Sequence, residues 1–406
     1  MNYAHPRIVP ADEPIVSRWP VYDRDTIAAV AGVLSSGRVN ALHHGEKCTA
    51  FEQAFARMCA QPHAIALANG TLALEVALRA LRIGAGDEVI VPARSFMATA
   101  SCVMACGATP VFADIDPVSQ GLDANLVAQC LTPRTRAVIV VHLAGYPCAV
   151  REIALLAHQL GIALIEDCAQ AHGATLGDAV VGSFGHAAAF SFCTDKIIST
   201  GGEGGMLVIR DDEVADRAWS LKDHGKDRRA IGAAHHGHGF RWLHSRCGSN
   251  YRLTEMQAAI GLCQLDRLDA WLAARRRNAG ILLHHLRGIP ALRLVEPSTG
   301  IGHAYYKFYA FVRPELLAPD WGRDRIVETC NRRGIPCQTG SCPEIYLEAA
   351  FTEAGIGPKH RLPVARALGA TSLCLPVDPT LDDTACARMG EVLASVIEEA
   401  TDRHAR

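Results

Sequence analysis

Residues 190–207 read FSFCTDKIISTGGEGGML, and this stretch points to the class of fold. Its first residues end one short apolar run, Ala187–Phe192, and its last residues begin another, Met206–Ile209. Short apolar runs bounded by glycine or polar residues are typical of buried strands. Between the two runs lie Lys196 and the glycine-rich segment Gly201–Gly205, which favours a loop. The stretch therefore predicts two buried strands whose connection carries a lysine.

Similar apolar runs recur upstream at intervals that leave room for a helix. They are Ala64–Ala68, Glu88–Val91, Thr109–Ala113, Ala137–Val141 and Ala163–Glu166. Amphipathic stretches of helical length lie between them, for example Thr71–Leu81, Phe96–Cys106 and Val150–Leu160. Buried strands that alternate with helices form a mostly parallel sheet with helices on both faces. The sequence therefore predicts an α/β fold, with a mostly parallel seven-stranded sheet flanked by helices in a large domain.

The pattern changes after residue 250. A single long helix is predicted over Thr254–Leu286, and it would link the large domain to the rest of the chain. The elements expected after it are a strand at Tyr305–Val312, a helix at Arg323–Arg333, a strand at Ser372–Leu375 and a helix from Leu381 to Glu399. We expect a large domain over residues 1–250, a linking helix over 251–290 and a small α+β domain over 291–406.

Composition excludes several classes of protein. The 406 residues include 40 Lys and Arg against 42 Asp and Glu, so charge gives no reason to expect nucleic acid as a partner. A hydrophobic fraction of 49% excludes a disordered chain. No apolar run approaches the ~18 residues of a membrane span, and the first residues do not read as a secretory signal. The 15 cysteines form no CxxC pair, so we expect reduced thiols, no metal site and a cytoplasmic location. The run HHGHG at 235–239 is expected to be a surface loop.

Asn69-Gly70-Thr71 directly follows one predicted strand and opens a predicted helix. A helix N-terminus presents free N–H groups and the positive end of the helix dipole, so it can bind an anion. The glycine would let the backbone approach that anion closely. The alternative is an ordinary strand-to-helix turn that Asn69 caps.

Asp167 and Gln170 lie at the carboxyl end of the strand that ends at Glu166. Ligands of open α/β sheets bind at this edge. A carboxylate there could hold a cationic ring nitrogen, and the amide could contact a ring oxygen. The alternative is a helix cap or a buried ion pair.

Lys196 is one of only six lysines in a chain with 34 arginines. It follows a buried strand, where a partly desolvated amine loses its proton more easily and can form a Schiff base. The alternative is a loop lysine that pairs with Asp195. A fourth feature is Gly248–Arg252, GSNYR, where Asn250 and Arg252 could bind phosphate or carboxylate, or could simply be structural.

Taken together, these features match one cofactor. An anion site, a carboxylate for a pyridinium nitrogen and a Schiff-base lysine are the protein groups that pyridoxal 5′-phosphate (PLP) requires. The three would come from different strand ends of one sheet, which makes coincidence an unsatisfactory explanation.

The sequence resembles the fold-type-I PLP aminotransferases and, within them, the nucleotide-sugar aminotransferase family of DegT/DnrJ/StrS type. The similarity covers about residues 30 to 380. The segments that carry it are ALANGTLALEVAL, GDEVIVPARSFMATA, VFADID, VVHLAGYP, IEDCAQAHGA, FSFCTDKIISTGGEGGML, LKDHG, GSNYRLTEMQAAIGLCQL and SLCLPVDP.

The resemblance implies a role for each candidate residue. Lys196 would be the internal-aldimine lysine and the base, and Asp167 would keep the pyridine nitrogen protonated. The other cofactor-binding residues would be Gln170 at the ring hydroxyl, Phe96 stacked on the ring, and Gly70, Thr71 and Ser191 at the phosphate. Asn250 would reach the cofactor phosphate of a partner subunit, so the active site would need a homodimer. Arg252 would be structural, and His172 has no role that the residues themselves explain.

The implied reaction moves an amino group from an amino acid, glutamate by expectation, to the keto group of a nucleotide-linked deoxysugar. Such sugars serve cell-surface polysaccharides or secondary metabolites. Relatives with histidine in place of the lysine are dehydratases, so Lys196 favours transamination. A keto-cyclitol aminotransferase, a PLP-dependent sugar dehydratase or lyase, and a non-catalytic sensory PLP protein stay open as alternatives. A nicotinamide-dependent oxidoreductase is disfavoured because no complete GxGxxG is present. The segment QTGSCPEIY at 338–346 is typical of a subgroup, so sugar contacts cannot be assigned there.

Overall fold

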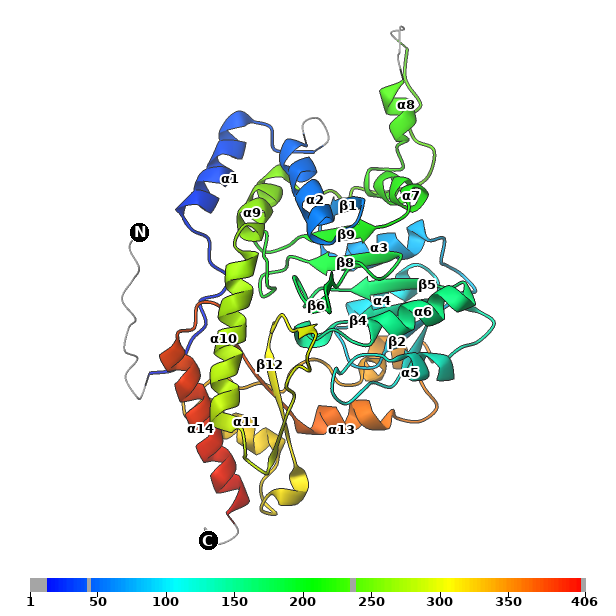
Figure 1. Cartoon of the computed structure of the whole chain (residues 1–406). Helices are drawn as coiled ribbons and strands as arrows, with labels where there is room; N and C mark the ends of the chain where they lie inside the picture. The colour runs from blue at the N-terminus through cyan, green and yellow to red at the C-terminus, as the bar shows by residue number, and fades with distance from the viewer. Residues whose placement is uncertain (1–12, 42–44, 234–238, 403–406) are drawn as a thin grey trace.

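The computed structural model describes residues 13–41, 45–233 and 239–402, and a seven-stranded sheet lies at its centre (Figure 1). The strands are β1 (His63–Leu67), β2 (Glu88–Pro92), β3 (Thr109–Ala113), β4 (Thr135–Val141), β5 (Ala163–Asp167), β8 (Ala187–Ser191) and β9 (Gly205–Ile209). Their order is β1-β9-β8-β5-β4-β2-β3. Only β9 runs against its neighbours, so all seven predicted strands and the mostly parallel sheet are confirmed.

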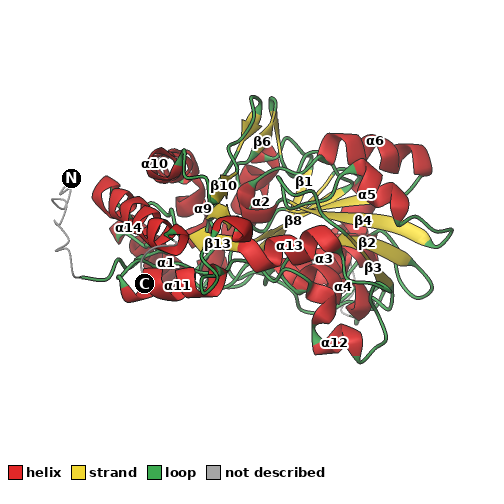
Figure 2. Ribbon diagram, turned by 90° about the horizontal axis from the view of Figure 1, so that it is seen from below, coloured by secondary structure: helices red, strands yellow, loops and turns green. Residues whose placement is uncertain are grey.

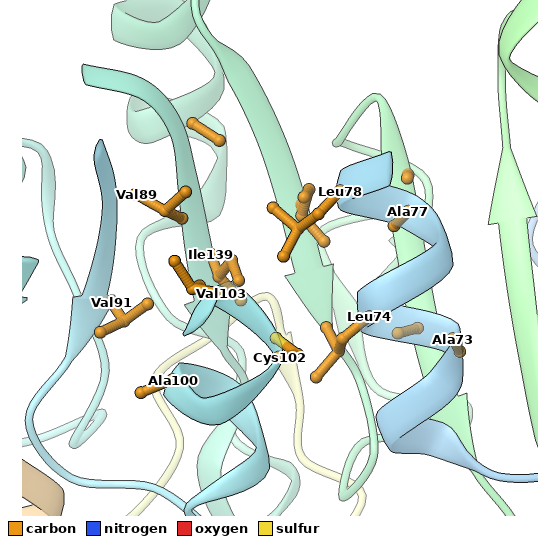
Figure 3. Packing of buried hydrophobic residues seen from close by; sticks show 14 of the residues in the cluster. Ala73, Leu74, Ala77, Leu78, Val89, Val91, Ala100, Cys102, Val103 and Ile139 are labelled. Atoms are coloured by element: carbon orange, nitrogen blue, oxygen red, sulfur yellow. The ribbon is translucent and has the colours of Figure 1, made fainter. Parts of the chain in front are cut away.

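Helices cover both faces of this sheet (Figure 2). One face packs against α3 (Gly70–Ala80), α4 (Ala98–Ala105) and α7 (Asp212–Lys222), and the other against α2 (Glu46–Met58), α5 (Ala124–Gln129), α6 (Val150–Leu160) and α9 (Glu255–Leu265). Alternation along β4 explains the two layers: Ala137 and Ile139 belong to one core, Val138 and Val140 to the other. Figure 3 shows the first core, where side chains of α3 and α4 gather over the strands.

The long helix predicted over Thr254–Leu286 is in fact two helices. The first, α9, ends at Leu265, and α10 (Leu268–Leu286) begins three residues later. No glycine or proline lies at the break between α9 and α10. The residues of the turn instead contact another part of the chain. Arg267 in the turn donates hydrogen bonds to Thr26 and Asp23 at the start of α1 (Arg24–Ser36), which packs on α9. Contacts with the N-terminal segment thus accompany a break that periodicity alone did not reveal.

The C-terminal part contains a three-stranded antiparallel sheet in the order β10-β12-β13. Its elements are β10 (Leu292–Leu294), β12 (Phe308–Val312), α11 (Arg323–Arg332), α13 (Pro363–Thr371), β13 (Ser372–Leu375) and α14 (Asp383–Thr401). The expected strands and helices are present here, whereas β10 and α13 were not foreseen. Residues of this part also join the core on one face of the large sheet, Phe311 and Phe351 among them. The domain boundaries at residues 250 and 290 stay a prediction.

Short elements complete the described chain. They are β6 (Thr175–Leu176), β7 (Ala179–Val180) and β11 (Ile301–Gly302), which form a small sheet, α8 (Arg228–Gly232), α12 (Ala349–Thr352), and the 3-10 turns η1 (Leu143–Gly145), η2 (Pro314–Leu316) and η3 (Ile345–Leu347). The segment around α8 projects from the body of the molecule (Figure 1). Apart from Gly239, the HHGHG run lies outside the described residues. Within the described ranges, no helix combines the length and apolarity needed to span a membrane.

Candidate active site

A cavity of about 930 Å³ opens at the carboxyl ends of the parallel strands. Its wall includes residues that follow β1, β2, β5 and β8, together with residues of the C-terminal part. Seven of the predicted site residues line it: Gly70, Thr71, Phe96, Asp167, Gln170, Ser191 and Lys196. Asn250 is exposed and is not among the described residues that line the cavity of this chain.

The first turn of α3 and the end of β8 meet at one side of the cavity. Gly70 and Thr71 begin the helix, and the Asn69 side chain caps it by accepting a hydrogen bond from the Leu72 N–H at 2.9 Å. A Cβ on Gly70 would lie 2.7 Å from the Cβ of Ser191, so only glycine fits here. Thr71 and Ser191 line the cavity next to the N-terminus of α3, where the free N–H groups of a helix could bind an anion.

Asp167 ends β5 in the floor of the cavity. One carboxylate oxygen accepts a hydrogen bond from the Thr99 hydroxyl at 2.8 Å and the other from the Ala169 N–H at 3.2 Å. Burial nevertheless raises the pKa of Asp167 above its usual value, against the hydrogen bonds and the charge of Lys196. A cation brought next to this carboxylate would stabilise its charged form. Asp167 is therefore poised to hold a cationic group of a ligand.

Gln170 and Phe96 present complementary surfaces to the same space. The Gln170 side-chain oxygen accepts a hydrogen bond from the Ala144 N–H at 2.7 Å, so its amide N–H₂ is the end left to donate to a ligand. The Phe96 ring is 68% exposed although it follows a buried strand. An exposed aromatic face at a cavity wall suits a flat ring. Together with Asp167, these residues could clamp a planar heterocycle.

Lys196 follows β8 and carries an amine close to both charge and an aromatic ring. Its Nζ lies 3.9 Å from Asp195 and 5.0 Å from the centroid of the Tyr306 ring, and the Tyr306 hydroxyl donates a hydrogen bond to Asp195. Burial works to raise the pKa of Asp195, but Lys196, this hydrogen bond and Lys307 lower it below its usual value. Lys196 therefore does form the ion pair with Asp195 that was the alternative interpretation, and it still lines the cavity.

Several lining residues were not foreseen from the sequence. They are Thr99, Tyr306, Lys307, Tyr309, Gln338, Ser341, Cys342 and Cys374. Most come from residues 306–374, far along the chain from the strand ends, and reach the cavity because β12 and β13 pack beside it. No local pattern marks them, although the alternation of Lys307 and Tyr309 in an extended segment would have placed both on one face.

The described residues contain one group of potential metal ligands, His142, Glu166 and Cys168, and all three are buried. Both Glu166 oxygens already accept hydrogen bonds. They come from the N–H groups of Gly182, Phe184 and Gly185 at 2.7–2.8 Å, and His142 Nε2 lies 3.1 Å away. A carboxylate satisfied in this way fixes the turn beneath β5. The cluster is therefore explained as structure.

Arg252 is not among the described residues that line the cavity. Its guanidinium pairs with Asp223, which is also 3.2 Å from Lys226 Nζ, and the Arg252 and Asp223 side chains are each 9% exposed. The backbone of Asn250 forms an isolated bridge with Asp223. The predicted structural role of Arg252 fits this arrangement.

Comparisons with known proteins agree with the geometry. A sequence model of the DegT/DnrJ/EryC1/StrS aminotransferase family matches residues 20–394. The GDP-perosamine synthase of Caulobacter vibrioides is 37% identical over 86% of this chain and 89% of its own length. The solved structure of an aminotransferase from Psychrobacter cryohalolentis shares 44% identity and superposes with a TM-score of 0.92, covering 95% of this chain and all of that one.

The cofactor of the family is represented among the solved relatives. NtdA of Bacillus subtilis was solved with the cofactor PMP bound, at 25% identity and a TM-score of 0.81 over 92% of this chain and 81% of that one. PMP is the aminated form of PLP. The protein belongs to the DegT/DnrJ/EryC1/StrS family of PLP-dependent sugar aminotransferases.

Proposed function

We propose that this protein transfers the amino group of an amino acid, with glutamate as the expected donor, to the keto group of a nucleotide-linked deoxysugar. We expect it to act in the cytoplasm, in the synthesis of sugars for cell-surface polysaccharides or secondary metabolites. The sugar class is supported by relatives such as the GDP-perosamine synthase. The reaction type is supported by a lysine, rather than a histidine, at position 196.

The residues present fit PLP. The Gly70–Ser191 approach forms the cradle for its phosphate, which a single added Cβ would fill, with the Thr71 and Ser191 hydroxyls as donors. Asp167 would accept a hydrogen bond from the protonated ring nitrogen, Gln170 would donate to the ring oxygen, and Phe96 would cover one ring face. Lys196 Nζ would hold the aldehyde carbon through a Schiff base. When bound, the cofactor supplies an electron sink for the carbanion formed at the donor's Cα.

With the donor bound, the free amine of Lys196 would have a second role. Its Nζ would take the proton from the donor's Cα and deliver it to C4′, the aldehyde carbon of the cofactor. Asp195 and the Tyr306 ring would keep the freed amine near its starting point, because both lie within 5.0 Å of it. Asp167 would hold its charge-assisted hydrogen bond in a buried setting, where it is worth more than in water.

One observation carries the proposal: Asp167 and Lys196 face one cavity from the neighbouring strands β5 and β8. Purified protein should be yellow, and Lys196→Ala should lose the absorbance band and transamination, whereas the exposed Lys359→Ala should retain both. Normal transamination by Lys196→Ala would refute the assignment. Asp167→Ala should lower turnover by a factor of ~100 or more while changing stability much less.

An assay with a panel of keto substrates would identify the sugar that accepts the amino group. Loaded enzyme should be incubated with glutamate and UDP-, dTDP- or GDP-linked keto-sugars, with keto-cyclitols in parallel, and the products weighed by mass spectrometry. Aminated sugar that forms only when glutamate is present supports the proposal. A product formed without an amino donor would favour the dehydratase or lyase alternative.

We further propose a homodimer in which the segment around α8 contacts a second copy of this chain. Phe240 and Trp242 in this segment are 74% and 85% exposed, and their rings meet edge to face at 5.4 Å. Exposed aromatic residues on a projecting segment are typical of an interface. Asn250, at the base of the segment, would then reach the partner's cofactor phosphate. Light scattering should find a dimer, and Phe240→Ser with Trp242→Ser should yield monomers that bind PLP weakly.

A further inference from the structure

Lys307 reaches the active-site cavity from the C-terminal part of the chain. It directly precedes β12, and Tyr306, Lys307 and Tyr309 all line the cavity, whereas Phe308 is buried in a core cluster and does not line it. The Lys307 Nζ lies 5.3 Å from the centroid of the Tyr306 ring, which is the ring that Lys196 also approaches.

Lys196 and Lys307 are the two cationic side chains among the described residues that line the cavity. Lys196 Nζ has a carboxylate partner, Asp195, at 3.9 Å. Within the described part of the chain, Lys307 has no carboxylate oxygen within 4.0 Å. The charge of Lys307 is therefore available to an anion that enters from outside.

A buried alternative cation can be set aside. Arg94 follows β2 and is fully buried, but its guanidinium donates to Gln120 at 2.9 Å and to Ser372 at 3.0 Å. It does not line the cavity. Arg94 thus connects β2 to β13 through Nε and Nη2, and its Nη1, which has no hydrogen-bond partner among the described residues, is buried outside the cavity wall.

We propose that Lys307 binds a carboxylate of the amino donor. This inference rests on the proposed function, in which Lys196 is committed to the cofactor and an amino acid must enter the cavity. The donor's amine would take the place of the Lys196 amine, and its carboxylates would then lie within a few ångströms of that point. Both lysine amines lie within 5.3 Å of one ring centroid, so Lys307 is the cation in reach. Asp167, Asp195 and Glu203 would otherwise repel the donor.

The test uses the PLP-loaded enzyme and three variants: Lys307→Met, Lys307→Arg and, as a control on the surface, Lys359→Met. Calorimetry would measure the binding of glutarate, a dicarboxylate that cannot react because it has no amine. Loss of one charge-assisted hydrogen bond should weaken glutarate binding by Lys307→Met ~10- to 100-fold. Lys307→Arg should stay within about fivefold of the wild type and Lys359→Met should match it. PLP affinity should be unchanged in all three.

The half-reaction with the amino donor would show whether Lys307 acts on donor binding or on the chemical step. With glutamate, Lys307→Met should show a raised concentration for half-maximal rate and a limiting rate changed less than about threefold. Glutamine and isoglutamine, each lacking one carboxylate, would tell which carboxylate Lys307 binds. Unchanged glutarate binding in Lys307→Met, or weakened binding of UDP, dTDP and GDP instead of glutarate, would overturn the proposal. If no amino acid reacts with the wild type, the proposed function fails, and glutarate binding still tests Lys307.

Discussion

The Tyr306 hydroxyl donates a hydrogen bond to the carboxylate of Asp195, the residue that precedes Lys196. Backbone hydrogen bonds hold Tyr306 in place. The Tyr306 N–H donates to the Ala144 carbonyl at 2.8 Å, and the Tyr306 carbonyl accepts a hydrogen bond from the Arg275 guanidinium at 3.3 Å. The loop that bears the reactive amine is thereby tied to a segment more than a hundred residues away in sequence. We therefore expect Tyr306 to position the loop that carries Lys196.

Tyr306→Phe removes this hydrogen bond and keeps the ring beside both lysines. We expect kcat to fall about tenfold, because the Lys196 amine loses part of its fixed position. Stability should fall by ~1 kcal/mol or less, since the Asp195 side chain is 55% exposed and can bind water. The control is Tyr305→Phe, whose ring instead stacks on His303. Steady-state kinetics of the two variants would decide, and equal losses in both would contradict the positioning role.

Gly70→Ala should disrupt the anion-binding end of the cavity. The added methyl would lie 2.7 Å from the Ser191 Cβ and 3.1 Å from the Ser191 Cα. Both atoms are held by the backbone, so the clash cannot be relieved by a change of rotamer. We expect PLP affinity to fall at least tenfold and stability to fall by ~1–3 kcal/mol.

Gly32→Ala is the matched control for this substitution. Gly32 lies inside α1, and no atom comes within 4 Å of the place that an added methyl would occupy, so alanine there should stabilise by ~0.5–1 kcal/mol. Cofactor titration and urea unfolding of both variants would test the pair. Wild-type PLP affinity in Gly70→Ala would show that the cradle does not bind the phosphate.

Arg252→Met should affect stability more than chemistry. Asp223 would keep Lys226 as a partner but lose the buried Arg252 guanidinium, and breaking a buried pair costs ~3–5 kcal/mol. The exposed pair of Arg287 and Glu296 offers the comparison, because solvent screens this pair and Arg287→Met should lower stability far less than Arg252→Met does. Urea unfolding measures both, and cofactor affinity of folded Arg252→Met should stay near that of the wild type. A loss of PLP binding without a loss of stability would instead place Arg252 in the site.

The sequence was sufficient for the sheet and for much of the cavity wall. Strand runs with both faces buried are continuous and apolar, as in AVIVV at 137–141, so their existence is readable without tertiary information. The carboxyl ends of parallel strands meet at one edge, which is why Asp167 and Ser191 could be placed together. The roles given to them came from family resemblance, and no contact within one chain tests those roles.

What the sequence did not reveal depends on contacts between distant segments. The break between α9 and α10 coincides with the Arg267 contacts to α1 and has no local signal. Thr99 is an ordinary helix residue until β5 brings Asp167 within 2.8 Å of its hydroxyl. Lys307 enters the cavity because β12 packs against β13 near the strand ends. Periodicity describes one element at a time and therefore cannot supply such pairings.

Acid should destabilise the fold in part through His172. The residue is fully buried among Phe55, Phe190 and Phe192, and among the described residues the polar group that acts on its ring from nearby is the Ser191 backbone, which opposes the effect of burial without forming a well-aligned hydrogen bond. Burial, helped by the charges of Lys196 and Arg275, lowers the pKa of His172 from 6.5 to about 3. Between these values the unfolded chain binds the extra proton and the folded chain does not.

The stability contributed by neutral His172 is therefore complete above pH 6.5 and is lost as pH falls toward 3, by up to ~1.4 kcal/mol per pH unit. Urea unfolding of the wild type at pH 7.5, 6.0 and 5.0 should show this slope, with a second contribution from His303, whose pKa burial also lowers to about 3. In His172→Leu the slope between pH 6.0 and 5.0 should shrink, because one protonation site is gone, whereas replacing the exposed His360 with glutamine should leave it unchanged. A His172→Leu protein that keeps the full wild-type slope would show that this histidine is already protonated, or accessible to protons, in the folded state.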